Sequence, residues 1–398
     1  MVNSKISNRA KNLFASPIRK FSNLVSKLEK QGTQVIKLNI GNPDIQPPRQ
    51  VIRALRAYNS SKLTYAPSNG KQEHIAAWLK YYADFGIKLK PDNLLPTIGA
   101  SEAICFSLMA LFDPGDEMLV FEPLYSNYKA MALMTNVKLK PVLLKLENNF
   151  ALPAANQITK KITSRTKAIL IINPDNPTGK VWQASELLTI AKIAKQHNLF
   201  IIADETYREI VFEGKFLSLL SFKQFRQRLV VIDSLSKRFS IPGLRIGAVV
   251  SFNKQFMQAV FKMAMVRLAA PSPGQLASVE ILKNATAYTK KITAEYNKRK
   301  EIVNQILAQT PGIDSRAPAG AFYQVIRLPV KNSQKFINYL LTKFRYKNKT
   351  LLVSPMQDFY ISQGLGKNEI RIAYMVGGQK LKLAMQIFKK ALEAYRQK

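Results

Sequence analysis

The sequence predicts an α/β fold in which a mainly parallel or mixed sheet is covered by helices on both faces. Three continuous apolar runs, at residues 168–172, 200–203 and 229–232, are typical of strands that are buried on both sides. A stretch with helical periodicity at residues 184–197 separates the first run from the second, which is the order expected of a strand–helix–strand unit. Further strands are predicted at residues 117–121 and 246–250.

Composition limits the class of protein before any motif is considered. The 398 residues are enough for two domains or one large one, and 47% of them are hydrophobic, so a sizeable core can be buried. Cys105 is the only cysteine, which excludes an intrachain disulfide. One cysteine and two histidines also exclude an ordinary zinc site. This composition fits a reducing, cytoplasmic setting.

The formal net charge of +35 raises the question of nucleic acid or another anionic partner. The lysines and arginines are spread along the whole chain, without a polybasic tail, so we expect a solvated basic shell and no specific nucleic-acid binding. No apolar run approaches the length of a membrane span. Residues 1–30 superficially resemble a basic transit peptide, but their apolar positions follow helical spacing. Those positions are Ile18, Phe21, Leu24, Val25 and Leu28.

Candidate ligand-binding positions lie in the first third of the chain. Gly41 follows a short strand and permits a close ligand approach, although the motif alone favours an ordinary turn. Tyr65, in a Pro/Gly loop, could reach a phosphate through its hydroxyl group or simply pack. A helix predicted to begin near Ser101, after a short strand, points free backbone N–H groups at an anion, which is compatible with Ser101 acting as a plain N-cap. Tyr125, just past a strand end, could stack on a flat cofactor or pack in the core.

Polar residues close each of the three apolar runs. Asn176 follows the first run in a turn with two prolines, at the sheet edge where open α/β sheets bind ligands. Asp204 closes the second run, and a buried carboxylate is costly unless it meets a cation or caps a helix. Lys237 follows the third run between hydroxyl groups, with Arg245 eight residues later. Hydroxyl groups plus arginine predict a phosphate seat, and the lysine beside it suggests a phosphorylated carbonyl cofactor held as a Schiff base.

Beyond the third run, helices are predicted at residues 254–270, 275–309 and 380–395, and strands from residue 318 and at 369–374. Arg371 lies among apolar neighbours in the last strand and needs a carboxylate, supplied either by a substrate or by a structural salt bridge.

Taken together, these motifs resemble the fold-type-I, pyridoxal-phosphate-dependent aminotransferases of class I and II, and the bacterial aspartate aminotransferases among them. The resemblance covers essentially the whole chain and rests on the order and spacing of residues 173–179, 204–207 and 234–245 and of Arg371. It implies a mixed, mostly parallel seven-stranded sheet in a large domain at residues 46–285. It also implies a smaller α+β domain formed by residues 1–45 and 286–398.

The resemblance implies a role for each candidate residue. Lys237 would bind pyridoxal 5′-phosphate covalently and shuttle protons, and Asp204 would keep the pyridine nitrogen protonated. Tyr207 and Asn176 would donate to the phenolate oxygen, and Tyr125 would stack on the ring. The phosphate would be bound by Ala100, Ser101, Ser234, Ser236, Arg245 and, from the neighbouring subunit of a homodimer with shared active sites, Tyr65. The substrate α-carboxylate would be bound by Arg371, with Gly41 and Asn176 close by.

Aspartate, or glutamate, is the predicted amino donor, and 2-oxoglutarate the acceptor. Some bacterial relatives carry a lysine where this chain has Ser101, so Arg267 is the candidate cation for the substrate side chain, although it is equally consistent with a surface arginine. An aromatic or alanine aminotransferase or a C–S β-lyase would use the same central residues. A nucleic-acid-binding protein is the alternative from a different class, suggested by the charge.

Overall fold

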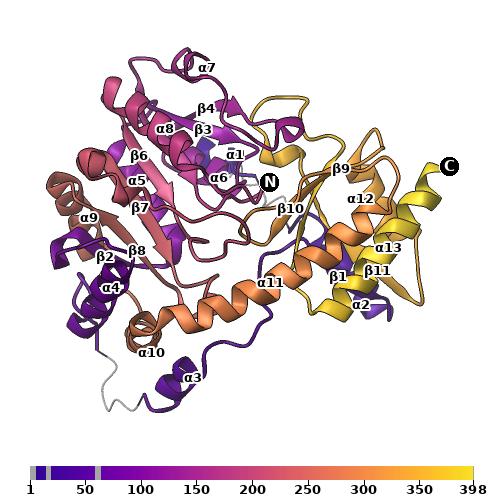
Figure 1. The fold of residues 1–398 in the computed structure, drawn as a ribbon, viewed down its shortest axis with the longest axis horizontal. Coiled ribbons are helices and arrows are strands. Elements are labelled where there is room, and N and C mark those ends of the chain that lie inside the picture. The colour runs from indigo at the N-terminus through magenta and orange to yellow at the C-terminus, as the bar shows by residue number, and fades with distance from the viewer. Residues whose placement is uncertain (1–5, 15–18, 59–63, 398) are drawn as a thin grey trace.

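The computed structural model describes residues 6–14, 19–58 and 64–397, and a seven-stranded sheet forms its centre (Figure 1). The strands lie in the order β2 (Leu94–Ile98), β8 (Ile246–Ser251), β7 (Leu229–Ser234), β6 (Phe200–Asp204), β5 (Thr166–Ile172), β3 (Glu117–Glu122) and β4 (Lys138–Leu143). Within this sheet β8 runs antiparallel to both of its neighbours, and the other pairs are parallel. The predicted mostly parallel sheet of seven strands is therefore confirmed.

Alternate residues of the central strands face two different hydrophobic cores. In β6, Ile201 and Ala203 join one core and Ile202 joins the other, which is the period of two expected of a strand buried on both faces. Helices α4 (Gln72–Asp84), α8 (Ala184–Gln196) and α10 (Ser272–Lys283) contribute to the first core. Helices α5 (Gly99–Leu111), α6 (Asn127–Met134) and α9 (Lys254–Arg267) contribute to the second.

A second part of the molecule has its own sheets and its own core. An antiparallel sheet contains β12 (Ser354–Pro355), β13 (Glu369–Ala373), β10 (Tyr323–Arg327) and β9 (Asp314–Ser315), and β1 (Gln34–Lys37) pairs in parallel with β11 (Lys349–Leu352). The core is formed with α2 (Ser22–Lys30), α11 (Ala285–Ala308), α12 (Ser333–Thr342) and α13 (Gly378–Arg396). The N-terminal segment thus packs with the C-terminal part, while the exact domain boundaries stay a prediction.

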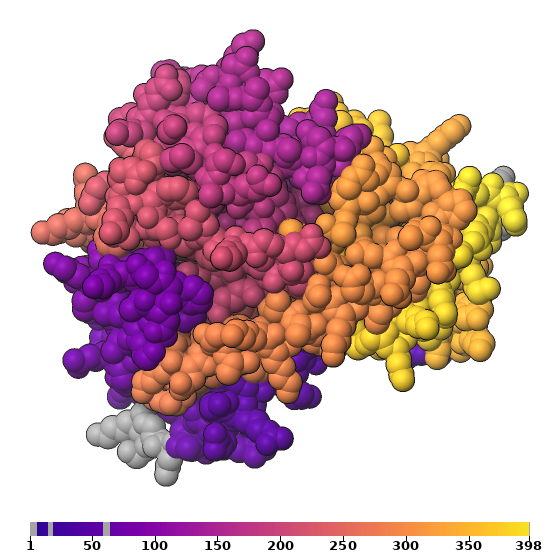
Figure 2. All heavy atoms as spheres, viewed as in Figure 1, coloured from indigo at the N-terminus to yellow at the C-terminus, as the bar shows by residue number. Residues whose placement is uncertain are grey.

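Helix α11 runs between the two parts, and its orange atoms connect them along one face of the molecule (Figure 2). The shorter helices are α1 (Asn8–Asn12), α3 (Arg49–Arg56) and α7 (Ala155–Thr159). Among the described helices, none combines the length and the apolar character that crossing a membrane requires.

The predicted single helix at residues 275–309 is wrong, because the chain forms α10 and α11 with a break at Asn284. Asn284 has a non-helical backbone (φ −130°, ψ 41°), and its side-chain Nδ2 donates to the carbonyl of Glu280. Asparagine competes in this way with the helical hydrogen bond to the same carbonyl. The prediction of helical spacing around Ile18 lies outside the described residues, whereas Val25 and Leu28 are buried on α2 as expected.

The strand predicted from residue 318 begins later, at Tyr323. The preceding residues bond to loops instead of a neighbouring strand: the N–H of Gly320 donates to Gly179 O, and that of Ala321 to Ile210 O. These contacts dock the second part of the molecule onto the segments that follow β5 and β6.

Candidate active site

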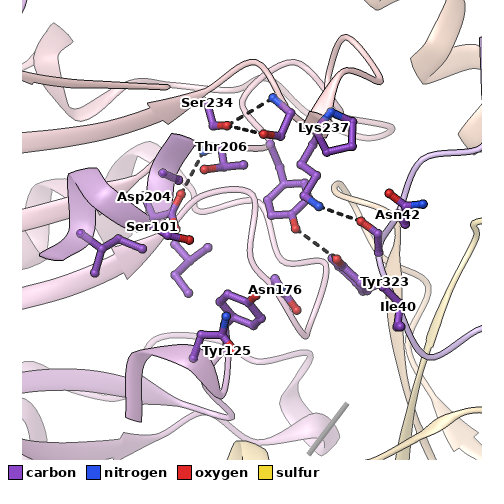
Figure 3. Close-up of a pocket in the computed structure, with 18 of the residues that line it drawn as sticks. Ile40, Asn42, Ser101, Tyr125, Asn176, Asp204, Thr206, Ser234, Lys237 and Tyr323 are labelled. Atoms are coloured by element: carbon purple, nitrogen blue, oxygen red, sulfur yellow. Dashed lines mark hydrogen bonds between the residues drawn. The ribbon is translucent and has the colours of Figure 1, made fainter. Parts of the chain in front are cut away.

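The carboxyl ends of β5, β6 and β7 meet at a cavity of about 500 Å³. Figure 3 shows Asn176, Asp204 and Lys237, which follow or end these strands, around the same cavity. The predicted site residues that line it are Gly41, Ala100, Ser101, Tyr125, Asn176, Asp204, Tyr207, Ser234, Ser236, Lys237, Arg245 and Arg371. A ligand-sized cavity at the carboxyl ends of parallel strands is where a small molecule is expected to bind in an open α/β sheet.

Lys237 extends across the cavity, and its Nζ donates to the carbonyl oxygen of Gly41 at 2.7 Å (Figure 3). Burial lowers the pKa of the Lys237 amine to about 8, and the positive charges of Arg371 and Arg245 act in the same direction. Position 41 has room only for glycine, because a Cβ atom there would collide with the hydroxyl group of Tyr323. The result is a lysine poised to react as a neutral amine.

Asp204 ends β6 and is buried, and among the described residues its carboxylate meets hydrogen-bond donors but no cation. Oδ2 accepts from the hydroxyl group of Tyr128 at 2.8 Å, and Oδ1 accepts from the backbone N–H of Thr206 at 3.1 Å. Burial raises the pKa of Asp204, although these hydrogen bonds oppose the shift. Turns follow Asp204, so its alternative interpretation as a helix cap is wrong.

An anion seat lies at the start of α5. The Arg245 guanidinium group packs against Gly99, where a Cβ atom would collide with it, and donates to the carbonyl oxygens of Ile98 and Pro242 at 3.2 and 3.0 Å. Ser234 Oγ donates to Ser236 Oγ at 2.9 Å on the facing loop. The unsatisfied N–H groups of a helix start, two hydroxyl groups and an arginine are the donors that a phosphate group needs.

Arg371 is buried in the cavity wall among neutral partners. Its Nη1 donates to Asn176 Oδ1 at 2.8 Å and its Nη2 to Asn39 O at 2.7 Å, while Nε has no hydrogen-bond partner. None of the described residues forms an ion pair with Arg371, so its interpretation as half of a structural salt bridge is wrong. Burial lowers the pKa of its guanidinium group. A ligand carboxylate would compensate this charge.

Three residues at the cavity could not be assigned from the sequence: Tyr128, Tyr323 and Arg19. Tyr128 holds Asp204, and the hydroxyl groups of Tyr323 and Tyr207 lie 3.1 Å apart. The Tyr323 ring also stacks under the guanidinium group of Arg371, 4.3 Å away. Tyr128 lies on the helix after Tyr125 and Tyr323 lies within a predicted strand, but nothing local marks either residue. Arg19 lies in the N-terminal segment, without a motif around it.

Two predicted site residues do not line the cavity of their own chain. Tyr65 is 78% exposed. Arg267 Nη1 donates to Glu102 Oε2 at 2.7 Å, which forms an ion pair at the start of α5. The expectation that these residues act in a neighbouring subunit's site stays a prediction.

A set of four charged residues lies behind the Lys237 loop, and we call it the buried ion cluster: Arg208, Glu209, Asp233 and Arg238. Arg238 Nη1 contacts Asp233 Oδ1 at 2.5 Å and its Nε lies 3.1 Å from Glu209 Oε2, while Arg208 Nη1 lies 3.3 Å from Asp233 Oδ2. Asp233 Oδ1 also accepts from the N–H of Ser234. The cluster therefore holds the loop that presents Ser234 and Lys237.

The residues present fit pyridoxal 5′-phosphate. A lysine with a lowered pKa, a buried carboxylate without a cation, and a phosphate seat surround one cavity. Tyr125 offers an aromatic ring in the cavity wall, and burial raises the pKa of its hydroxyl group to about 12, which keeps it protonated. This set of residues offers a partner for each part of the cofactor: its aldehyde, its ring nitrogen, its phosphate group and its flat ring.

Comparison with known proteins agrees with this geometry. Residues 33–386 match the family model of the class I and II aminotransferases. An aspartate aminotransferase of Pyrococcus horikoshii is 32% identical over 385 residues, which is 95% of both chains. A double mutant of the Thermus thermophilus aspartate aminotransferase superposes with a TM-score of 0.89 at 25% identity, over 98% of this chain and 100% of that one. An alanine aminotransferase of Pyrococcus furiosus has a TM-score of 0.88 at 28% identity, over the same shares of both chains.

Proposed function

Since this chain belongs to the class I and II aminotransferases, we propose that it uses pyridoxal 5′-phosphate to transfer the amino group of aspartate, or of glutamate, with 2-oxoglutarate as acceptor. The observation that carries the proposal is that Lys237, with its lowered pKa, shares one cavity with Asp204 and the anion seat. We also propose that the enzyme works in the cytoplasm.

The cofactor would be held at four points. Lys237 Nζ would bond to it, Asp204 would face its ring nitrogen, and Tyr125 would pack against the ring. The N–H groups of Ala100 and Ser101 would bind the phosphate group together with the side chains of Ser234, Ser236 and Arg245. Asn176 and Tyr207 would donate to its ring oxygen.

When bound, the cofactor supplies a carbonyl carbon that accepts an amino group and a ring that withdraws electrons from the substrate Cα. Arg371 orients the amino acid by binding its α-carboxylate with a planar fork of donors. Once the substrate amine has displaced Lys237 from the cofactor, the freed Lys237 amine would take the proton from Cα, because burial lowers its pKa to about 8. Asp204, kept from water by burial, holds a proton on the ring nitrogen.

We propose that two copies of the chain share their active sites, with Tyr65 reaching the phosphate group of its neighbour. Exposed apolar residues on the described surface support this: Tyr65 is 78% exposed and Val266 is 87% exposed. Large apolar side chains exposed on the surface are suited to burial against a second copy. Analytical ultracentrifugation at micromolar concentration tests the proposal, and a monomer would contradict it.

An absorbance spectrum and a substrate panel test the function together. The purified protein loaded with pyridoxal 5′-phosphate is expected to show a visible band that Lys237→Ala lacks. Aspartate and glutamate are expected to react fastest with 2-oxoglutarate as acceptor. A preference for alanine or aromatic amino acids would overturn the substrate assignment, and pyruvate release without an acceptor would indicate a β-lyase.

A further inference from the structure

Four cationic side chains line the cavity, and the proposed function gives a task to three of them. Lys237 bonds to the cofactor, Arg245 belongs to the anion seat and Arg371 binds the α-carboxylate, which leaves Arg19. Asp204 is the carboxylate that lines the described cavity, and it is assigned to the ring nitrogen. The cavity thus carries one cation more than the cofactor and an α-carboxylate require.

Arg19 is placed at the cavity by the two segments on either side of it. Before it, α1 lies against α6, where Arg9 Nη1 donates to the carbonyl of Met134 at 2.9 Å. After it, Phe21 and Leu24 pack against the core of the second part of the molecule. Arg19 itself is exposed, and it forms no ion pair or hydrogen bond with the described residues. As far as the described residues show, its guanidinium group is available to a ligand that enters the cavity.

Arg267, the cation predicted from the sequence for this task, is already paired. Its Nη1 donates to Glu102 Oε2 at 2.7 Å and its Nη2 lies 3.4 Å from Pro96 O. Glu102 Oε2 in turn accepts from the N–H of Ile98 at 2.9 Å. To bind a substrate carboxylate, Arg267 would have to leave a partly buried ion pair, which Arg19 does not have to do.

We propose that Arg19 binds the side-chain carboxylate of a dicarboxylic substrate whose α-carboxylate is held by Arg371. This inference rests on the proposed function and names the residue that selects the substrate class. Ile40 and Met131 also line the cavity and offer an apolar wall for the methylene groups between two such carboxylates. Burial raises the pKa of the Tyr125 hydroxyl group, and the positive charges of Arg371 and Arg19 oppose that shift. Both guanidinium groups are therefore close enough to Tyr125 for their charges to affect it.

Binding of two unreactive acids to the cofactor-loaded protein tests the proposal without turnover. Maleate carries two carboxylates, and isocrotonate has the same cis four-carbon frame with only one. In Arg19→Gln the dissociation constant of maleate, measured by calorimetry, is expected to rise roughly 10- to 100-fold, because a charge-assisted hydrogen bond is lost. The dissociation constant of isocrotonate is expected to stay within about twofold, since Arg371 remains.

Two control variants separate a local contact from a change in net charge. Lys27→Gln removes one exposed positive charge from α2, and it should leave maleate binding unchanged. If Arg267→Gln weakens maleate binding and Arg19→Gln does not, the proposal is wrong and the prediction for Arg267 is restored. Equal weakening of maleate and isocrotonate in Arg19→Gln would also overturn it.

Steady-state kinetics distinguish failure of this proposal from failure of the proposed function. Arg19→Gln should lower kcat/KM for aspartate while leaving kcat/KM for alanine nearly unchanged, as expected of a specificity residue. If the wild-type protein transaminates alanine faster than aspartate, the assignment of Arg19 fails while the aminotransferase activity stands. If no amino acid reacts but maleate binding still depends on Arg19, the proposed function fails and the anion site remains.

Discussion

Arg371 and Arg238 are both buried arginines, but the partners of their guanidinium groups differ in charge. Arg238 meets the carboxylates of Asp233 and Glu209. Arg371 meets a side-chain amide oxygen and a backbone carbonyl oxygen. Burial opposes the charge of both, yet the pKa of Arg238 is raised, because Asp233 compensates it, and the pKa of Arg371 is lowered.

The difference distinguishes charges that stabilise the fold, in the buried ion cluster, from charges that a ligand would neutralise, in the cavity. The buried ion cluster contains two arginines and two carboxylates, so it is neutral when every member is ionised. Although burial raises the pKa of Asp233, Arg238 and Arg208 hold it below its usual range. The cavity instead combines several cations with Asp204. An uncompensated buried charge is costly, so its retention marks a binding site.

The same substitution at both arginines sharpens this comparison, and the largest effect is expected at Arg238. Arg238→Met leaves Asp233 and Glu209 without one of their cations, which should lower the free energy of unfolding by about 3–5 kcal/mol. Denaturant unfolding of the cofactor-free protein measures this change. A loss below about 1 kcal/mol would show that the cluster is not held by charge compensation.

Arg371→Met should act on substrate binding and spare the fold. Loss of a buried charge contact to the α-carboxylate should lower kcat/KM by about 2–5 kcal/mol in transition-state free energy, roughly 30- to 4,000-fold, for every amino acid. The free energy of unfolding should stay constant or rise, because a buried unpaired cation is removed. A stability loss as large as that of Arg238→Met would break the distinction between the two arginines.

The pH dependence of cofactor capture tests the charge state of Lys237. Its pKa of about 8 means that the neutral amine increases as pH rises toward 8 and is dominant above it. The rate at which the cofactor-free protein binds pyridoxal 5′-phosphate should therefore increase about tenfold per pH unit below 8 and level off above. In Arg371→Met the midpoint should move upward, because a nearby positive charge no longer disfavours protonation. A midpoint near 10 in the wild-type protein would contradict this account.

Two tyrosines allow the cavity and the buried ion cluster to be compared by the loss of a single hydroxyl group. Tyr128 donates to Asp204 in the cavity, and Tyr82 donates to Asp233 in the buried ion cluster, each at 2.8 Å. Tyr128→Phe should weaken cofactor binding by about 0.5–1.5 kcal/mol, or roughly 2- to 12-fold in dissociation constant. Tyr82→Phe should lower stability by a similar amount and leave the dissociation constant nearly unchanged. Equal effects of the two variants on cofactor binding would remove the distinction.

The central sheet and most of the cavity could be predicted because their signals are local. Each apolar run is followed within a few residues by the polar group that it delivers to the sheet edge, as in β6 with Asp204 and β7 with Ser234. Parallel strands bring these ends together whatever the intervening helices contain.

The remaining site residues depend on contacts between distant segments. Tyr323 stands 116 positions from Tyr207, and Arg19 lines the cavity ahead of α2, which packs in the second core. The pairing of Arg267 with Glu102 spans 165 positions and is equally invisible in the local pattern. The break at Asn284 was missed because apolar periodicity continues through it, whereas the side chain stops the helix.

We propose that a single amine, that of Lys237, binds the cofactor. The most direct measurement is to load the purified protein with pyridoxal 5′-phosphate, reduce it with sodium borohydride and map the modified peptide by mass spectrometry. We expect stoichiometric modification of Lys237, which is lost in Lys237→Ala and retained in the Arg238→Met protein that is still folded. Modification scattered over other lysines, or none at all, would contradict it.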